Sequence, residues 1–85
     1  MSEKQYLAEF IKQLRLYDDE SSLRSFLEAI LTPKELEEIP KRLQIVKMLK
    51  QGIPQREISE NLGVGIATVT RGSKEVNKGN FQDIA

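Results

Sequence analysis

The stretch from Gln55 to Arg71, QREISENLGVGIATVTR, constrains the fold more than any other part of the chain. Gly63 and Gly65 interrupt a pattern that is otherwise helical, which predicts two short helices joined by a tight turn. A tight turn needs a positive φ angle, and Gly63 can adopt one without strain. Ser59, four residues earlier, supplies the small side chain that two closely crossing helices need where they touch. The apolar residues that would hold the crossing together are Ile58, Leu62, Val64 and Val69. This segment has the layout of a helix-turn-helix.

The second of these helices exposes short polar side chains, which suit a helix inserted into the major groove of DNA. They are Thr68, Thr70 and Ser73, together with the longer, polar Lys74. Gly65 leaves the start of this helix open, so its backbone N–H groups can approach a phosphate. A helical corner that only packs is the alternative, but the combined placement of the residues favours DNA binding. A nucleotide-binding phosphate loop is excluded, because no strand precedes the segment and the G-x-x-x-x-G-K-[ST] spacing is missing.

The remaining sequence also predicts helices, because apolar residues recur three and four positions apart. The expected helices cover residues 7–17, 23–31, 33–52, 54–62 and 65–79. At the third helix, Thr32 can cap the start and Glu35 can complete a capping box, and Gly52 suits its end. Pro40 should remove one backbone bond and bend the start of that helix. The last residues have no sustained periodicity and are expected to fray. The fold class is therefore all-α, a helical bundle with a helix-turn-helix.

Charge is distributed unevenly along the chain. The thirteen basic and thirteen acidic residues cancel, but residues 1–40 hold five basic and nine acidic residues, a net charge of −4. Residues 41–85 hold eight basic and four acidic residues, a net charge of +4. This asymmetry is typical of a protein whose C-terminal half faces a polyanion such as nucleic acid. Chance segregation of solvated charges is the alternative.

Several classes of function are disfavoured by composition. The chain has no cysteine and no histidine, so it lacks thiolate metal ligands, disulfides and the commonest general base. The carboxylate cluster Glu35, Glu37 and Glu38 suits the acidic first turn of a helix, so we expect neither an enzyme nor a metal site. No apolar run approaches the roughly 18–20 residues of a membrane span, and the acidic, polar N-terminus does not resemble a signal peptide. We expect a cytoplasmic protein without a membrane partner.

Three segments of the second half of the chain and the residues just before it closely resemble a known family. GIATVTRGS, preceded by QREISENLGV and by LTPKELEEIPKRLQIVKMLKQG, resembles the tryptophan operon repressor family. The match runs without gaps from Leu31 to Gly52 and resumes from Gln55 to Ser73, after a shortened linker at Ile53-Pro54. The first two helices match only in pattern.

The resemblance implies a single domain over residues 1–85 that forms an intertwined homodimer. Residues 1–52 would be the dimerisation core, and residues 54–78 the helix-turn-helix, termed here the reading head. The implied function is a transcriptional repressor that recognises a specific, palindromic operator of tryptophan-related genes on double-stranded DNA. L-Tryptophan would act as its corepressor, a small-molecule ligand and not a catalytic cofactor.

Two arginines are implied as the centre of the tryptophan site. Arg42 and Arg71 match positions that sandwich the indole ring, and a guanidinium can both stack on an aromatic face and pair with a carboxylate. Other positions matching the pocket are Thr32, Thr68, Gly72 and Glu75, together with Ala29 and Leu31, whose segment accepts the ligand's ammonium across the dimer.

Glu75 departs from the family, which commonly has a hydroxyl at this position. Its carboxylate could bind the ligand's ammonium, clash with the ligand's carboxylate, or pair with Arg71 and block the pocket. Two alternatives therefore stay open: a helix-turn-helix regulator that needs no ligand, and one that responds to a different amino acid or indole derivative. A helical module that binds a protein instead of DNA is a third.

The positions expected to meet DNA lie at the start of the first short helix and along the second. They are Gln55, Arg56, Ile66, Ala67, Thr68, Thr70, Arg71, Ser73 and Lys74. Lys74 stands where the family usually has a small amide, so its longer cationic side chain is expected to add a phosphate contact and to steepen the salt dependence.

Overall fold

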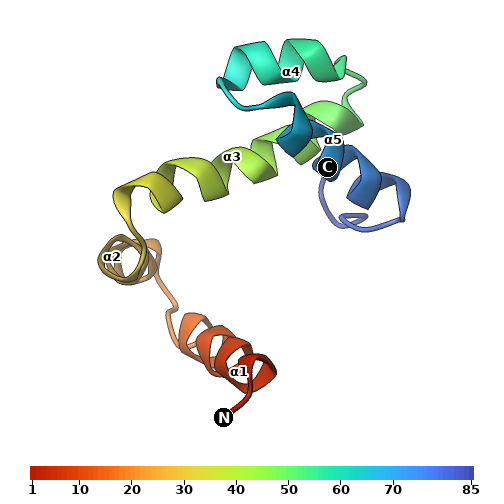
Figure 1. Cartoon of the computed structure of the whole chain (residues 1–85). Helices are drawn as coiled ribbons and strands as arrows, with labels where there is room; N and C mark the ends of the chain where they lie inside the picture. The colour runs from red at the N-terminus through yellow and green to blue at the C-terminus, as the bar shows by residue number, and fades with distance from the viewer. The chain divides into compact units, whose positions relative to one another are not determined.

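A computed structural model describes residues 1–85 and contains five α-helices and no strand (Figure 1). The helices are α1 Glu3–Leu14, α2 Glu20–Ile30, α3 Pro33–Lys50, α4 Gln55–Leu62 and α5 Ile66–Asn77. The predicted all-α class is confirmed. None of these helices combines the length and the apolar character that crossing a bilayer requires. The chain packs as two compact units, residues 1–36 and residues 37–85, which are described separately.

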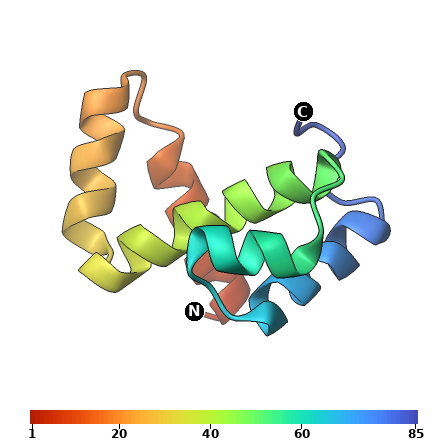
Figure 2. The same ribbon diagram turned by 90° about the horizontal axis from the view of Figure 1, so that it is seen from above.

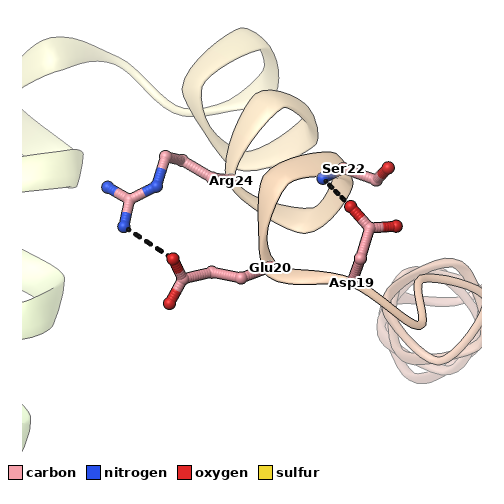
Figure 3. A network of polar contacts seen from close by, with 4 residues as sticks. All are labelled: Asp19, Glu20, Ser22 and Arg24. Carbon is pink, nitrogen blue, oxygen red and sulfur yellow. Dashed lines mark hydrogen bonds and ion pairs between the residues drawn. The ribbon is translucent and has the colours of Figure 1, made fainter.

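The helices of the first unit begin at side-chain caps. At the start of α1, the Ser2 hydroxyl and the Gln5 side chain form a reciprocal capping box. The start of α2 is capped by Asp19, whose carboxylate accepts a hydrogen bond of 2.8 Å from the backbone N–H of Ser22 (Figure 3). This bond is the main reason that the pKa of Asp19 lies below its ordinary value. These caps satisfy backbone donors that the first helical turn leaves without partners.

Aromatic side chains join α1 to α2. The ring of Phe26 lies 6.1 Å from that of Phe10 and 5.4 Å from that of Tyr17, with tilted planes. Such pairs contribute about 0.5–1.5 kcal/mol beyond the area they bury. Neither helix contains a fully buried residue, so the apolar stripes predicted for residues 7–17 and 23–31 are only partly covered within the chain.

The predicted capping box of α3 is confirmed. The backbone N–H of Glu35 donates to the Thr32 hydroxyl at 3.1 Å, and the backbone N–H of Thr32 donates to the Glu35 carboxylate at 2.8 Å. Pro40 lies inside α3 without ending it. After the helix, Gly52 takes the left-handed conformation with φ 81°, as expected for the residue beyond a helix end.

The core of the second unit consists of three side chains, one each from α3, α4 and α5. Ile45, Ile58 and Val69 meet there and are at most 1% exposed. Figure 2 shows these three helices gathered together. The surrounding apolar side chains that pack on this cluster are Met48, Leu49, Ile53, Leu62 and Val64. All four apolar residues predicted to hold the helix crossing together are therefore in or against the core.

The turn between α4 and α5 has the geometry that its residues predict. Gly63 ends α4 with φ 65°, in the left-handed region. The N–H of Val64 donates to the Ser59 carbonyl at 3.1 Å, and the Ser59 hydroxyl donates to the Val64 carbonyl at 2.6 Å. Ser59 thus fixes the turn by hydrogen bonds in addition to being small. Neither α4 nor α5 has a side-chain cap at its start.

The residues after α5 contact the end of α3. They form a succession of turns, and the Lys50 ammonium donates to the backbone carbonyls of Phe81 and Ile84. These contacts with the end of α3 were not expected from the sequence, and the fraying of the segment stays a prediction. Such a contact between residues more than thirty positions apart leaves no trace in local periodicity.

Candidate functional site

A hollow of about 720 Å³ lies between α3 and α5 in the second unit, within the range of small-molecule sites. Its lining comes from α3, from α5 and from the segment after α5. The residues are Arg42, Leu43, Ile45, Val46, Ala67, Thr68, Arg71, Gly72, Glu75, Phe81 and Ile84. Apolar walls with a few charged groups are what a binding site for an aromatic, charged ligand needs.

Two of the predicted ligand residues, Arg42 from α3 and Arg71 from α5, line this hollow together. Both are exposed, and neither forms a hydrogen bond or ion pair within the chain. Both guanidinium groups are therefore available to a ligand that offers an aromatic face or a carboxylate.

Glu75 also lines the hollow, but its carboxylate is turned to other partners. It accepts hydrogen bonds from the Asn80 amide at 2.6 Å and from the Lys78 ammonium at 3.2 Å. These two groups, with a small contribution from the charge of Arg71, hold the pKa of Glu75 below its ordinary value. The ion pair with Arg71 that the sequence allowed does not form in this structure, so Arg71 is not blocked.

Gly72 lies where α5 comes closest to α3. A Cβ atom at this position would lie 3.0 Å from Cγ2 of Ile45 and 3.6 Å from Cδ1 of Leu49. The close approach expected from a glycine in mid-helix is confirmed, and its partner is the α3 side chain. Thr68 lines the same hollow and is exposed.

The other predicted ligand positions belong to the first unit. Thr32 caps α3, Ala29 lies in the last turn of α2, and Leu31 ends that helix. None of the three lines the hollow. Their assignment depends on a dimer and stays a prediction.

The outward face of α5 carries the residues predicted to meet DNA. A shallow groove there is bordered by Ala67, Thr70, Arg71, Lys74, Glu75 and Lys78. Of these, Ala67, Arg71 and Glu75 also line the ligand hollow. Ile66 is 51% exposed at the start of the helix, Lys74 is exposed and Ser73 half-buried.

The start of α4 is tied to α5 by a side-chain hydrogen bond. The Thr70 hydroxyl donates to the Gln55 amide oxygen at 3.0 Å. This bond leaves the Gln55 NH₂ group free to donate elsewhere, while the neighbouring Arg56 is exposed. The bond was not predicted from the sequence, since fifteen residues separate its partners.

Sequence reasoning also missed residues of the hollow. Phe81 and Ile84 come from a segment without periodicity, and Leu43 was assigned only to the apolar side of a helix. The one available signal was composition, because Phe81 and Ile84 are apolar residues in a polar stretch, NKGNFQDIA.

Two short helices that cross over a tight turn, α4 and α5 with Gly63 between them, form a helix-turn-helix, an arrangement common among DNA-binding proteins. The sequence pattern of the family described as Trp repressor protein matches residues 5–83. The chain belongs to this family, as the resemblance of its motifs predicted.

Individual relatives agree with this membership. A Trp operon repressor homolog of Actinobacillus succinogenes is 46% identical over 65 residues, which cover 75% of this chain and 64% of that protein. One of Haemophilus influenzae is 38% identical over 68 residues, 79% of this chain and 67% of that protein. One of Vibrio cholerae is 43% identical over 76 residues, 88% of this chain and 71% of that protein. Against the Actinobacillus protein, the match therefore spans slightly less than two thirds of the relative's length.

Proposed function

We propose that this protein is a transcriptional repressor that binds operator DNA as a homodimer when L-tryptophan occupies the hollow between α3 and α5. Membership of a family named for repressors supports a regulator and not an enzyme. The proposal includes a cytoplasmic location, as expected from the sequence. The target site would be a palindrome, since a twofold dimer presents two equivalent reading heads.

One observation carries the proposal: Arg42 and Arg71 line the same apolar hollow, and neither has an ion-pair partner within the chain. The indole ring of tryptophan can lie between two guanidinium groups, and the carboxylate of the amino acid can pair with one of them. Arg71 also borders the outward groove of α5. A ligand held by Arg71 would therefore influence the position of the helix proposed to enter the major groove.

The apolar surface of the first unit supports a dimer. Large side chains of α1 and α2 that are between 46% and 59% exposed are Tyr6, Leu7, Ile11 and Ile30. Such apolar exposure along helices without buried residues is typical of an interaction surface. In the proposal, residues 1–52 bury this surface in the dimer core, residues 54–78 form the reading head, and Ala29, Leu31 and Thr32 complete the ligand site across the dimer.

Calorimetric titration with L-tryptophan tests the ligand. We expect saturable binding to the wild type and at least about tenfold weaker binding to Arg42→Ala and Arg71→Ala, because each loses a guanidinium that stacks on the indole ring. Arg24→Ala is the matched control, since Arg24 is an exposed arginine that pairs only with Glu20 on α2 (Figure 3). Flat titrations with tryptophan and related indoles reject the corepressor.

Gel shifts with an operator-like palindrome, with and without tryptophan, test the regulation. We expect tighter binding with the ligand. Equal affinity in both conditions supports the alternative of a ligand-independent helix-turn-helix regulator, whereas a response to another amino acid or indole alone supports a different effector. A protein without salt-dependent affinity for any duplex contradicts DNA binding altogether.

A further inference from the structure

The segment Asn80–Ile84, termed here the 80–84 turn, supplies part of the hollow's apolar lining. Phe81 and Ile84 contribute side chains to it, although neither belongs to a helix. The remaining apolar lining comes from α3 and α5. The 80–84 turn therefore adds a third wall between the two helices that carry Arg42 and Arg71.

Two anchors hold the 80–84 turn in place, one from each helix. From the end of α3, the half-buried Lys50 donates to the backbone carbonyls of Phe81 and Ile84. From α5, the Glu75 carboxylate accepts a hydrogen bond of 2.6 Å from the Asn80 side chain. Both are charge-assisted hydrogen bonds, which are stronger than neutral ones.

The backbone of Phe81 has an unusual conformation within the 80–84 turn. Its φ angle is 66°, which makes it the one non-glycine residue with a positive φ in the structure. A bulky side chain rarely adopts this conformation, and it persists only where surrounding contacts impose it. Here the two lysine bonds and the 3.1 Å bond from the Ile84 N–H to the Phe81 carbonyl impose it.

The charges of the hollow define what can bind beside this wall. Arg42 and Arg71 are without ion-pair partners, while the charge of the Glu75 carboxylate is paired with the Lys78 ammonium and the carboxylate also accepts a hydrogen bond from the uncharged Asn80 amide. The hollow therefore favours an anionic group together with an apolar body.

We propose that Phe81 and Ile84 form an apolar wall that selects which aromatic anions the hollow accepts, and that Lys50 and Glu75 position this wall. The inference rests on the proposed ligand-binding function and extends it: the 80–84 turn, and not only the two arginines, determines ligand specificity. The selected class is a flat aromatic ring that bears an anionic group and places one ring edge against Phe81 and Ile84.

Titration of the full chain with a small panel of ligands tests the wall. The panel is L-tryptophan, its four mono-methyl derivatives at ring positions 4 to 7, and indole-3-acetate. We expect Phe81→Ala and Ile84→Ala to bind L-tryptophan about tenfold more weakly, the order expected when one apolar wall is lost. In Phe81→Ala, at least one methyltryptophan should gain about threefold relative to L-tryptophan, because its methyl group fills the vacated space. Gln82→Ala, an exposed change in the same turn, should behave as the wild type.

The pattern of outcomes separates this inference from the proposed function. If the wild type binds L-tryptophan and Phe81→Ala binds every ligand as tightly as the wild type does, the proposal of an apolar wall is rejected, whereas the proposal of tryptophan as corepressor is retained. If all ligands weaken by the same factor while the thermal midpoint falls, Phe81 is structural only and the wall is again rejected. If the wild type binds indole-3-acetate but not L-tryptophan, and Phe81→Ala changes the affinity for indole-3-acetate, the proposal of an apolar wall is retained and that of tryptophan as corepressor is rejected. Binding of no ligand in the panel rejects both.

Lys50 is proposed as a positioning residue, so its test uses ligand preference. Lys50→Met should reproduce the altered methyltryptophan preference of Phe81→Ala, because the turn loses its anchor on α3. Lys50→Arg should restore the wild-type preference, since a guanidinium can donate to two carbonyls. Wild-type preference in Lys50→Met would overturn the positioning role of Lys50.

Discussion

Replacing Gly72 by alanine sets two physical effects of opposite sign against each other. In the middle of a helix, alanine is favoured over glycine by about 1 kcal/mol, because glycine loses more conformational freedom on folding. At this position, however, the new Cβ would lie 3.0 Å from Cγ2 of Ile45. Such a contact is tighter than normal van der Waals packing, so Ile45 or the helix has to shift.

The size of the steric effect follows from the surroundings of Ile45. This side chain is 1% exposed and belongs to the core cluster, and a β-branched residue in a helix has essentially one rotamer. It cannot swing away, and overpacking of this kind costs about 1–3 kcal/mol. We therefore expect Gly72→Ala to be destabilising by about 1 kcal/mol after the gain in helix propensity is subtracted.

Repeating the Gly72→Ala substitution in an Ile45→Leu variant isolates the contact between residue 72 and the Ile45 side chain. In Ile45→Leu the branch moves from Cβ to Cγ, so the atom that faces Gly72 is removed at nearly constant volume. In that background Gly72→Ala should stabilise the protein, by up to about 1 kcal/mol. Urea denaturation of the four proteins of this double-mutant cycle, at one fixed protein concentration, gives the coupling between the two positions.

Two results would refute this reasoning. A stabilising Gly72→Ala in the wild-type background means that the steric cost against Ile45 is smaller than the gain in helix propensity. An identical effect of Gly72→Ala in both backgrounds means that Ile45 is not the side chain responsible.

Three further predictions concern the cap of α3, the turn and the DNA face. The backbone N–H of Thr32 holds the pKa of Glu35 below its ordinary value of 4.5. Because the folded-state pKa is depressed, the stabilisation is complete above the unfolded-state pKa and is lost as the pH falls below about 4.5 through the folded-state value. In thermal melts, Glu35→Gln should lose this part of the acid sensitivity while keeping the cap, and parallel pH profiles of the two proteins would contradict this. Ser59→Ala removes the 2.6 Å bond to the Val64 carbonyl and should lower the free energy of unfolding by about 1 kcal/mol in urea titrations; an unchanged midpoint would show that water replaces the hydroxyl. If Lys74 contacts a phosphate, Lys74→Gln should reduce the slope of log affinity for DNA against log salt by about 0.9, and an unchanged slope would remove Lys74 from the interface.

The parts of the structure that local chemistry determines could be predicted from the sequence. The Thr32–Glu35 capping box, the positive φ of Gly63 and the burial of Ile58 and Val69 follow from residue types at fixed spacings. Each depends on residues within one or two helical turns, where periodicity and capping preferences act.

Contacts between distant residues could not be predicted in this way. The sequence offered Arg71 as the partner of Glu75, four residues away on one helix face, but the carboxylate binds Asn80 and Lys78 instead. The contribution of Phe81 to the hollow depends on Lys50, which lies 31 residues earlier. Such pairings depend on how the chain turns back after α5, and a segment without periodicity gives no information about that.

The distribution of helix caps has a consequence for motion within the second unit. α1, α2 and α3 each begin at a side-chain cap, whereas α4 and α5 begin without one. Short uncapped helices are marginal in isolation, so α4, at eight residues, depends on the core shared with α5. Their amide protons should therefore exchange with solvent through one common opening event. A ligand that displaces α5 should therefore displace α4 as well.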